Sequence, residues 1–145
     1  MIPDDVRHAV MERAGYRCEY CLIVGWELQV DHIMPRSPRR GDQARLVAEL
    51  DDRQNLAAAC SRCNRLKGNF VTGPSVLFGA THPLFNPRTD EWSMHFAWSA
   101  DYRRIVPLTP TGDATIERLD MNAPVLRRQR ELLRRAARAG GTPWP

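Results

Sequence analysis

The chain has 145 residues, 43% of them hydrophobic, which suits one folded domain or one domain with an appendage. No apolar run approaches the roughly 20 residues that a membrane helix needs, so the sequence predicts no membrane span. Residues 1–5 lack the basic and then apolar regions of a signal peptide, and we expect a cytoplasmic protein. The net charge of +4 is compatible with a polyanionic partner but is too common to identify one.

The N-terminal part of the chain predicts a helix followed by a strand. Apolar residues recur at helical spacing over 3–14, and Gly15 is placed to end that helix. Apolar residues then alternate with polar ones over 26–33, which is typical of a strand. This strand carries Asp31 and His32 at its end.

A loop, a short strand and a short helix are expected next. Residues 35–40 are rich in proline and arginine and predict a loop, inside which 44–50 can form a helical turn. Residues 55–59 predict a short apolar strand. Ser61 can cap the helix that follows, and Gly68 lies near the end of this helix.

The C-terminal half predicts a different mixture of elements. Residues 79–87 are typical of a loop, whereas 92–98 alternate as in a half-buried strand with which 104–108 could pair. We expect a helix over 112–120 and a last helix that Asn122 caps.

The last predicted helix is amphipathic and strongly basic. Its expected apolar face consists of Val125, Leu132, Leu133, Ala136 and Ala137. Arginines fill most of the remaining positions over 127–138. They suit contact with a nucleic-acid backbone and equally suit a solvated face of a helix that packs on the core.

All four cysteines occur in two CxxC pairs, Cys18 with Cys21 and Cys60 with Cys63. Two such turns present four thiolates to one ion, which is the shell that structural zinc prefers. Zinc binding of this kind contributes on the order of 10 kcal/mol to the folding of small domains. A redox dithiol or unrelated thiols are the alternatives, but the double pairing in a cytoplasmic protein favours zinc.

Further polar residues stand between and beside the two cysteine pairs. In chain order the pattern is Cys18-x-x-Cys21, Asp31-His32-Ile33-x-Pro35, Asn55-Leu56 and Cys60-x-x-Cys63-Asn64-x-x-Lys67. From about Arg17 to Gly68 this pattern resembles the zinc-containing HNH endonucleases. Residues 84–98 also resemble an extension found in a bacterial subset of these proteins.

The resemblance implies an α+β fold. Its core would be the ββα-metal arrangement of two strands and a helix, with a four-cysteine zinc site and a small C-terminal strand-and-helix extension. We accordingly expect a nuclease core over 1–73, which includes the N-terminal helix and the zinc knuckles. An extension over 74–145 would pack on this core and end in the basic helix.

The resemblance also implies roles for four polar residues. His32 would be the general base that takes a proton from the attacking water. Asp31 and Asn64 would bind a catalytic magnesium or manganese ion through oxygen atoms. Asn55 would orient His32 by bonding the backbone or the ring in the loop.

The expected substrate is nucleic acid, most of all double-stranded DNA, nicked with limited sequence specificity, while RNA stays open. The residues expected to contact its phosphates are Arg36, Arg39, Arg40, Arg65 and Lys67. The competing interpretation is a non-catalytic, zinc-stabilised nucleic-acid-binding module. Such a module would not need Asp31, His32 and Asn64 together, so this trio favours the enzyme.

Overall fold

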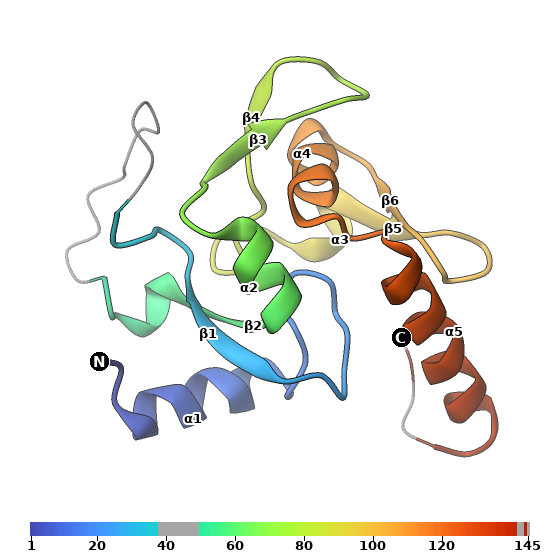
Figure 1. Cartoon of the computed structure of the whole chain (residues 1–145), viewed down its shortest axis with the longest axis horizontal. Helices are drawn as coiled ribbons and strands as arrows, with labels where there is room; N and C mark the ends of the chain where they lie inside the picture. Colours follow the sequence, from blue (N-terminus) through green and yellow to red (C-terminus); the bar gives the residue numbers. More distant parts are fainter. Residues whose placement is uncertain (38–49, 142–143, 145) are drawn as a thin grey trace.

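The computed structural model describes residues 1–37, 50–141 and 144 (Figure 1). These residues form five α-helices, one 3-10 helix and three two-stranded antiparallel sheets, so the fold class is α+β, as predicted. Among the described residues, no helix is long and apolar enough to cross a membrane. Arg39, Arg40 and nearly all of the predicted turn at 44–50 lie outside the described residues.

Two strands between two helices form the centre of the N-terminal half (Figure 1). Strand β1 (Leu28–His32) pairs antiparallel with β2 (Leu56–Cys60). Helix α1 (Asp4–Arg13) and helix α2 (Ser61–Lys67) both contact this pair of strands. The sequence predicted each of these elements to within a few residues of its bounds.

Alternation along β2 directs its side chains to two separate clusters. Leu56 and Ala58 pack with Val10 of α1, whereas Ala57 and Ala59 belong to the cluster that contains the cysteines. All five residues of β2 are buried, so both faces of this strand are covered. The paired strands therefore hold α1 on one face and the cysteine cluster on the other.

The junctions around β2 differ from the prediction in two details. The 3-10 helix η1 (Arg53–Asn55) precedes β2, so the strand begins at Leu56 and not at Asn55. The predicted cap Ser61 is wrong, because Cys60 is the N-cap of α2 and its sulfur accepts a hydrogen bond from the Cys63 amide at 3.4 Å. A cysteine sulfur thus takes the place of a hydroxyl cap. Gly68 ends the helix, as predicted.

A small hairpin occupies part of the region that was predicted to be loop. Strands β3 (Thr72–Pro74) and β4 (Thr81–Pro83) pair antiparallel, so the loop prediction over 79–87 is wrong for its first half. The hairpin is fixed from a distance, because the buried carboxylate of Asp113 accepts hydrogen bonds from the Ser75 hydroxyl and the Leu77 amide. Local sequence patterns do not reveal such a contact.

The predicted strand over 92–98 is also wrong for its first half. Residues Trp92–His95 form the short helix α3, and only Phe96–Trp98 form a strand, β5. The indole Nε1 of Trp92 donates to the carbonyl oxygen of Tyr20 at 3.0 Å, so tertiary packing decides the local conformation. Strand β6 (Ile105–Pro107) pairs with β5, which confirms the predicted pairing.

Two longer helices complete the chain. Helix α4 (Pro110–Leu119) confirms the predicted helix and is capped by the Thr109 hydroxyl. Helix α5 (Pro124–Arg138) begins after Ala123, so the predicted cap Asn122 is wrong. The Asn122 side chain instead accepts from the amide of Ile105 and donates to its carbonyl oxygen.

The buried face of α5 matches the predicted apolar face only in part. Leu133 of the predicted face is partly buried and packs against the cluster that contains the cysteines. Leu126 and Arg130 are buried, whereas Val125 and Leu132 are exposed. Sequence reasoning placed every arginine of this helix on the polar side, and it therefore missed the register that buries Arg130.

One hydrophobic cluster draws residues from both halves of the chain. It surrounds the four cysteines with Ile23, Ile33, Phe85, Phe96, Ile105, Ile116, Leu119, Met121 and Leu126 among others. The cysteine cluster is therefore part of the main core and not a separate surface knuckle. The division into domains at residue 73 stays a prediction.

Candidate metal and nuclease site

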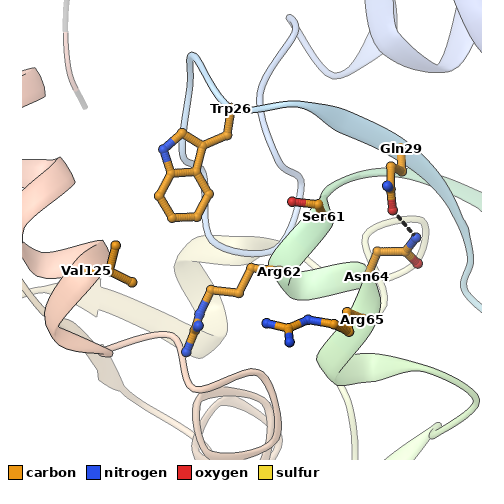
Figure 2. Close-up of a pocket in the computed structure, with 7 residues that line it drawn as sticks. All are labelled: Trp26, Gln29, Ser61, Arg62, Asn64, Arg65 and Val125. Carbon is orange, nitrogen blue, oxygen red and sulfur yellow. Dashed lines mark hydrogen bonds between the residues drawn. The ribbon is translucent and has the colours of Figure 1, made fainter.

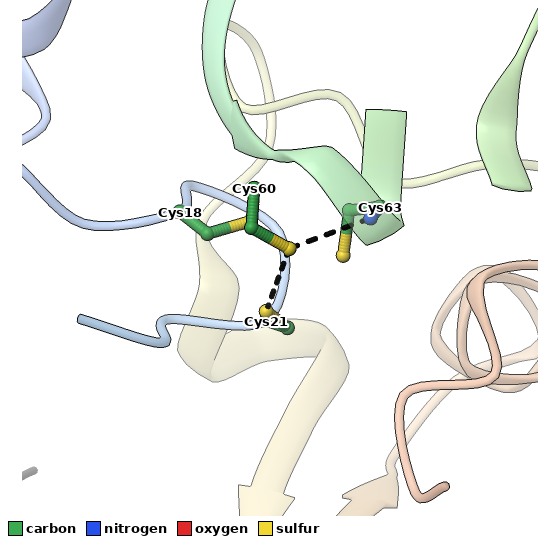
Figure 3. A group of neighbouring side chains, drawn as sticks. All are labelled: Cys18, Cys21, Cys60 and Cys63. Carbon is green, nitrogen blue, oxygen red and sulfur yellow. Dashed lines mark hydrogen bonds between the residues drawn. The ribbon is translucent and has the colours of Figure 1, made fainter. Parts of the chain in front are cut away.

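The sulfur atoms of the four cysteines converge in the core (Figure 3). All four residues are buried, and their Sγ atoms lie within 4.8 Å of one another. The Sγ atoms of Cys21 and Cys60 are 3.9 Å apart. Zinc with four thiolates at about 2.3 Å requires sulfur–sulfur distances of about 3.8 Å. The cluster therefore fits zinc in both donor chemistry and size.

Local backbone structure positions each cysteine pair. In the first pair, the amide of Leu22 donates to the carbonyl oxygen of Cys18, which closes a tight turn. The second pair spans the junction of β2 and α2, so a strand and a helix fix its two sulfurs. Hydrogen bonds from Cys18 and then Cys21 lower the pKa of Cys60, whereas hydrogen bonds from the neighbouring thiols raise the pKa of Cys63.

A buried guanidinium lies beside the cysteine cluster. Arg130 is fully buried, and it donates to the carbonyl oxygens of Met121 at 2.7 Å and Arg103 at 3.0 Å. Among the described residues it has no carboxylate partner. Burial lowers the pKa of Arg130, and the thiols of Cys21 and Cys63 oppose that shift. Negative charge on these two thiols would therefore favour the charged form of Arg130.

Asp31 is enclosed by two donors from other elements. Its Oδ2 accepts from the Tyr20 hydroxyl at 2.6 Å, and its Oδ1 lies 3.2 Å from the Lys67 ammonium. Lys67 also donates to the carbonyl oxygen of His32 at 2.8 Å. The side chains of Lys67 and Asp31 are only 2% and 4% exposed. Burial raises the pKa of Asp31, and the ammonium of Lys67 opposes this shift.

His32 faces a carboxylate that sequence reasoning did not identify. Its Nε2 lies 2.7 Å from Oδ1 of Asp51, and both Asp51 oxygens accept from Arg36. The contacts with His32 and then Arg36 lower the pKa of Asp51. The acidic pair Asp51-Asp52 in an otherwise arginine-rich stretch was the available signal for this partner.

Asn55 closes the base of the loop that follows β1. Its carboxamide oxygen accepts from the amide of Met34 at 2.8 Å, and its nitrogen donates to the carbonyl oxygens of Met34 and Leu50. These bonds tie together the chain just after His32 and the chain just before η1. They match the expected bonding to backbone, while an influence on His32 itself stays a prediction.

Asn64 lies on α2 beside an open pocket of about 550 Å³ (Figure 2). Its carboxamide nitrogen donates to the Gln29 side chain of β1 at 2.7 Å. Its carboxamide oxygen has no hydrogen-bond partner in the described part of the chain. Arg65, another predicted phosphate contact, lines the same pocket and is exposed.

Asp31, His32 and Asn64 lie on β1 and α2, which contact each other, but their side chains have different partners. Asp31 and His32 are neighbours on β1 and so point to opposite faces of the strand. Asn64 and Lys67 lie about one turn apart on α2. No hydrogen bond joins Asp31, His32 or Asn64 to one another within the described residues.

The oxygen atoms of Asp31 and Asn64 are of a kind that a hard divalent cation binds. The carboxylate of Asp31, however, is poorly accessible to such a cation. Carboxylate and amide oxygens are appropriate ligands for magnesium or manganese. The Oδ1 atom of Asp31, however, is engaged by the ammonium of Lys67 in a buried position. A cation at Asp31 would have to displace that ammonium.

The C-terminal half is fastened to the first cysteine turn. Arg88 forms an ion pair with Glu19, which stands between Cys18 and Cys21. Trp92 donates to the carbonyl oxygen of Tyr20, whose hydroxyl in turn binds Asp31. Arg88 and Trp92 therefore contact residues next to the cysteine cluster and next to Asp31.

Comparison with known proteins agrees with this geometry. The family model of the HNH endonuclease matches residues 18–70. The matched segment contains both cysteine pairs and every signature residue from Asp31 to Asn64, which confirms the resemblance for this part of the chain. Searches of curated proteins and of solved structures found no match. The match indicates a nuclease or nucleic-acid-binding function.

Proposed function

We propose that the chain is a divalent-metal-dependent endonuclease that hydrolyses phosphodiester bonds of double-stranded DNA. The observation that carries the proposal is His32 beside Asp51, within a segment that matches the HNH endonuclease model. A histidine held by a carboxylate is a suitable general base, because the carboxylate stabilises the imidazolium that forms.

The contact with Asp51 assigns different roles to the two ring nitrogens of His32. When Nε2–H donates to the Asp51 carboxylate, Nδ1 carries the lone pair. Nδ1 would then take a proton from water, and the resulting hydroxide would attack the phosphorus. The bond from phosphorus to the leaving oxygen would break, and this oxygen would take up a proton from solvent, which leaves one strand nicked. Asp51 acts through His32 and is a positioning residue.

Asp31 and Asn64 are the residues that would hold magnesium or manganese. The bound ion would supply stabilisation of the negative charge that develops on the phosphate. The Lys67 ammonium would first leave Oδ1 of Asp31 and could then reach a phosphate, which is the role expected from the sequence. Arg36 and Arg65, both exposed, would contact the DNA backbone together with Arg39 and Arg40.

A second candidate function is a non-catalytic zinc-stabilised module that binds nucleic acid. The buried ion pair of Asp31 and Lys67 favours this alternative, because it leaves the carboxylate with little room for a cation. Both candidates predict DNA binding that weakens as salt rises, and only the endonuclease predicts cleavage.

Supercoiled plasmid incubated with magnesium, and then with manganese, tests the proposal. We expect nicking with limited sequence specificity by the wild-type protein, and loss of nicking in His32→Ala or with a chelator. His8→Ala is the matched control, since His8 is exposed on α1 and, among the described residues, has only Glu12 as its partner. Equal cleavage by His32→Ala and wild type would exclude His32 as the base. Binding without cleavage under every metal condition would favour the module.

A further inference from the structure

The pocket beside Asn64 contains residues to which the proposed cleavage step assigns no role, Trp26 and Gln29 among them. Its walls come from the start of β1, from α2 and from the start of α5 (Figure 2). The lining residues are Trp26, Gln29, Ser61, Arg62, Asn64, Arg65 and Val125. They include two arginines, one tryptophan and no carboxylate. The volume of about 550 Å³ is in the range of small-molecule sites.

The two arginines of the pocket differ in how their charge is balanced. Arg62 forms an ion pair with Asp120 at 2.5 Å, which fixes it against α4. Arg65 has no hydrogen-bond or ion-pair partner within the described residues, and Figure 2 shows its guanidinium directed to the same space as that of Arg62. A second guanidinium without an acid, beside one already paired, is an arrangement that attracts an anion such as phosphate.

The remaining walls suit the base of a nucleotide. Trp26 is partly exposed and stands with Val125 on one side of the pocket, where a flat aromatic ring could stack (Figure 2). On the opposite side, Asn64 and Gln29 are bonded to each other. Asn64 keeps its carboxamide oxygen and Gln29 keeps its amide nitrogen without other partners in the described chain. The Asn64 oxygen is the proposed metal ligand, so the Gln29 amide nitrogen is the donor left for the edge of a base.

The pocket also has a defined position relative to the proposed reaction site. Gln29 and Asp31 lie on the same face of β1, about 7 Å apart along the strand. Asn64 and Lys67 occupy the corresponding positions on α2, because they contact Gln29 and Asp31 respectively. The pocket is therefore one end of the β1–α2 contact, and Asp31 is the other end.

We propose that this pocket binds one nucleotide of the nucleic-acid substrate, with its base against Trp26 and its phosphate on Arg65. The proposal rests on the proposed function, since it assigns a place to a nucleotide near the one that is cleaved. Stacking on an aromatic ring tolerates any base, which agrees with limited sequence specificity.

Isothermal titration calorimetry on the full-length, zinc-loaded protein without magnesium or manganese tests this site. The probes are thymidine 5′-monophosphate, thymidine and inorganic phosphate. We expect the monophosphate to bind more tightly than either fragment, because only it engages both walls. Trp26→Leu should weaken monophosphate binding about tenfold through lost stacking. Arg65→Gln should weaken both the monophosphate and inorganic phosphate.

Two matched controls separate the pocket from general surface effects. Arg128→Gln removes an exposed arginine of α5, and Phe78→Leu removes an exposed aromatic ring of the β3–β4 hairpin. Neither should change binding of the monophosphate. Absence of binding to the wild type, or equal weakening by the control variants, would overturn the proposal.

A His32→Ala variant distinguishes failure of this proposal from failure of the proposed function. It should bind the monophosphate as the wild type does, because His32 does not line the pocket. Binding that persists while no metal condition gives cleavage would reject the endonuclease and keep the nucleotide site. Cleavage that persists with unchanged rate in Trp26→Leu and Arg65→Gln would reject the site and keep the endonuclease.

Discussion

The cysteine cluster and the surroundings of His32 lie within one matched segment but have opposite physical character. All four cysteines are buried, and residues from both halves of the chain pack around them. The side chains of His32 and Asp51 are 19% and 41% exposed, and their partner Arg36 is on the surface.

This difference separates the residues that stabilise the fold from those that are available for chemistry. Loss of a buried and bonded group destabilises the protein, whereas change of a partly exposed group mainly alters what the surface can do. The ion pair of Asp31 with Lys67 combines features of both regions, because it is buried like the cysteines yet adjoins His32.

The largest expected effect comes from the cysteine cluster. Cys60→Ser removes one thiolate and also the N-cap of α2, so bound zinc and its contribution on the order of 10 kcal/mol should be lost. We expect an unfolded or molten protein by circular dichroism and no zinc by elemental analysis. A variant that keeps its fold, from a wild type that contains no zinc, would contradict the assignment of the cluster.

The buried ion pair should give the next largest effect. Lys67→Met leaves the Asp31 carboxylate buried without its ammonium, and Asp31→Asn leaves the ammonium alone. Each should lower the free energy of unfolding in urea by about 3 kcal/mol. The double variant should lose clearly less than the sum of the two, because no unpaired charge remains. Arg65→Met on the same helix is the control and should change little. Additive losses would show that the pair is not coupled.

Arg130 tests whether the C-terminal half balances the charge of the metal site. Arg130→Met keeps much of the side-chain volume but removes the buried positive charge beside the thiols. We expect zinc affinity to fall about tenfold in competition with a chromogenic chelator. Arg135→Met, on the exposed face of α5, should leave that affinity unchanged. Equal affinities for Arg130→Met and wild type would contradict the charge argument.

Asp51 should have the smallest effect on stability. Its carboxylate is partly exposed, so Asp51→Asn should leave the urea midpoint almost unchanged. The rate of plasmid nicking should nevertheless fall, because His32 loses the group that orients its ring and stabilises its charge. A lowered urea midpoint with an unchanged rate of nicking would show that Asp51 stabilises the fold and does not act through His32.

The elements that the sequence predicted well are those with strong local signals. The apolar alternation before Asp31 predicted β1, Ser61 and Gly68 predicted α2, and the paired CxxC turns predicted the cysteine cluster. The strand predicted at Trp92 failed because its indole is bound to the backbone of Tyr20, more than 70 residues earlier in the chain. Long-range contacts of this kind leave no local pattern.

The candidate site was predicted only in part for a similar reason. Motif order identified Asp31, His32, Asn55 and Asn64, but not the partners that surround them. Lys67 was expected at the surface among phosphate contacts, yet it is buried against Asp31. Asp51 and Arg130 were missed because their roles depend on which thiol or imidazole lies beside them after folding.

Chemical rescue of His32→Gly is the most direct test of the central claim that His32 is the general base. The single-turnover rate of DNA cleavage by this variant should fall by about a hundredfold or more. Added imidazole should restore part of the rate, in proportion to the concentration of its neutral form. Cleavage by His32→Gly at the wild-type rate, with or without imidazole, would contradict the claim.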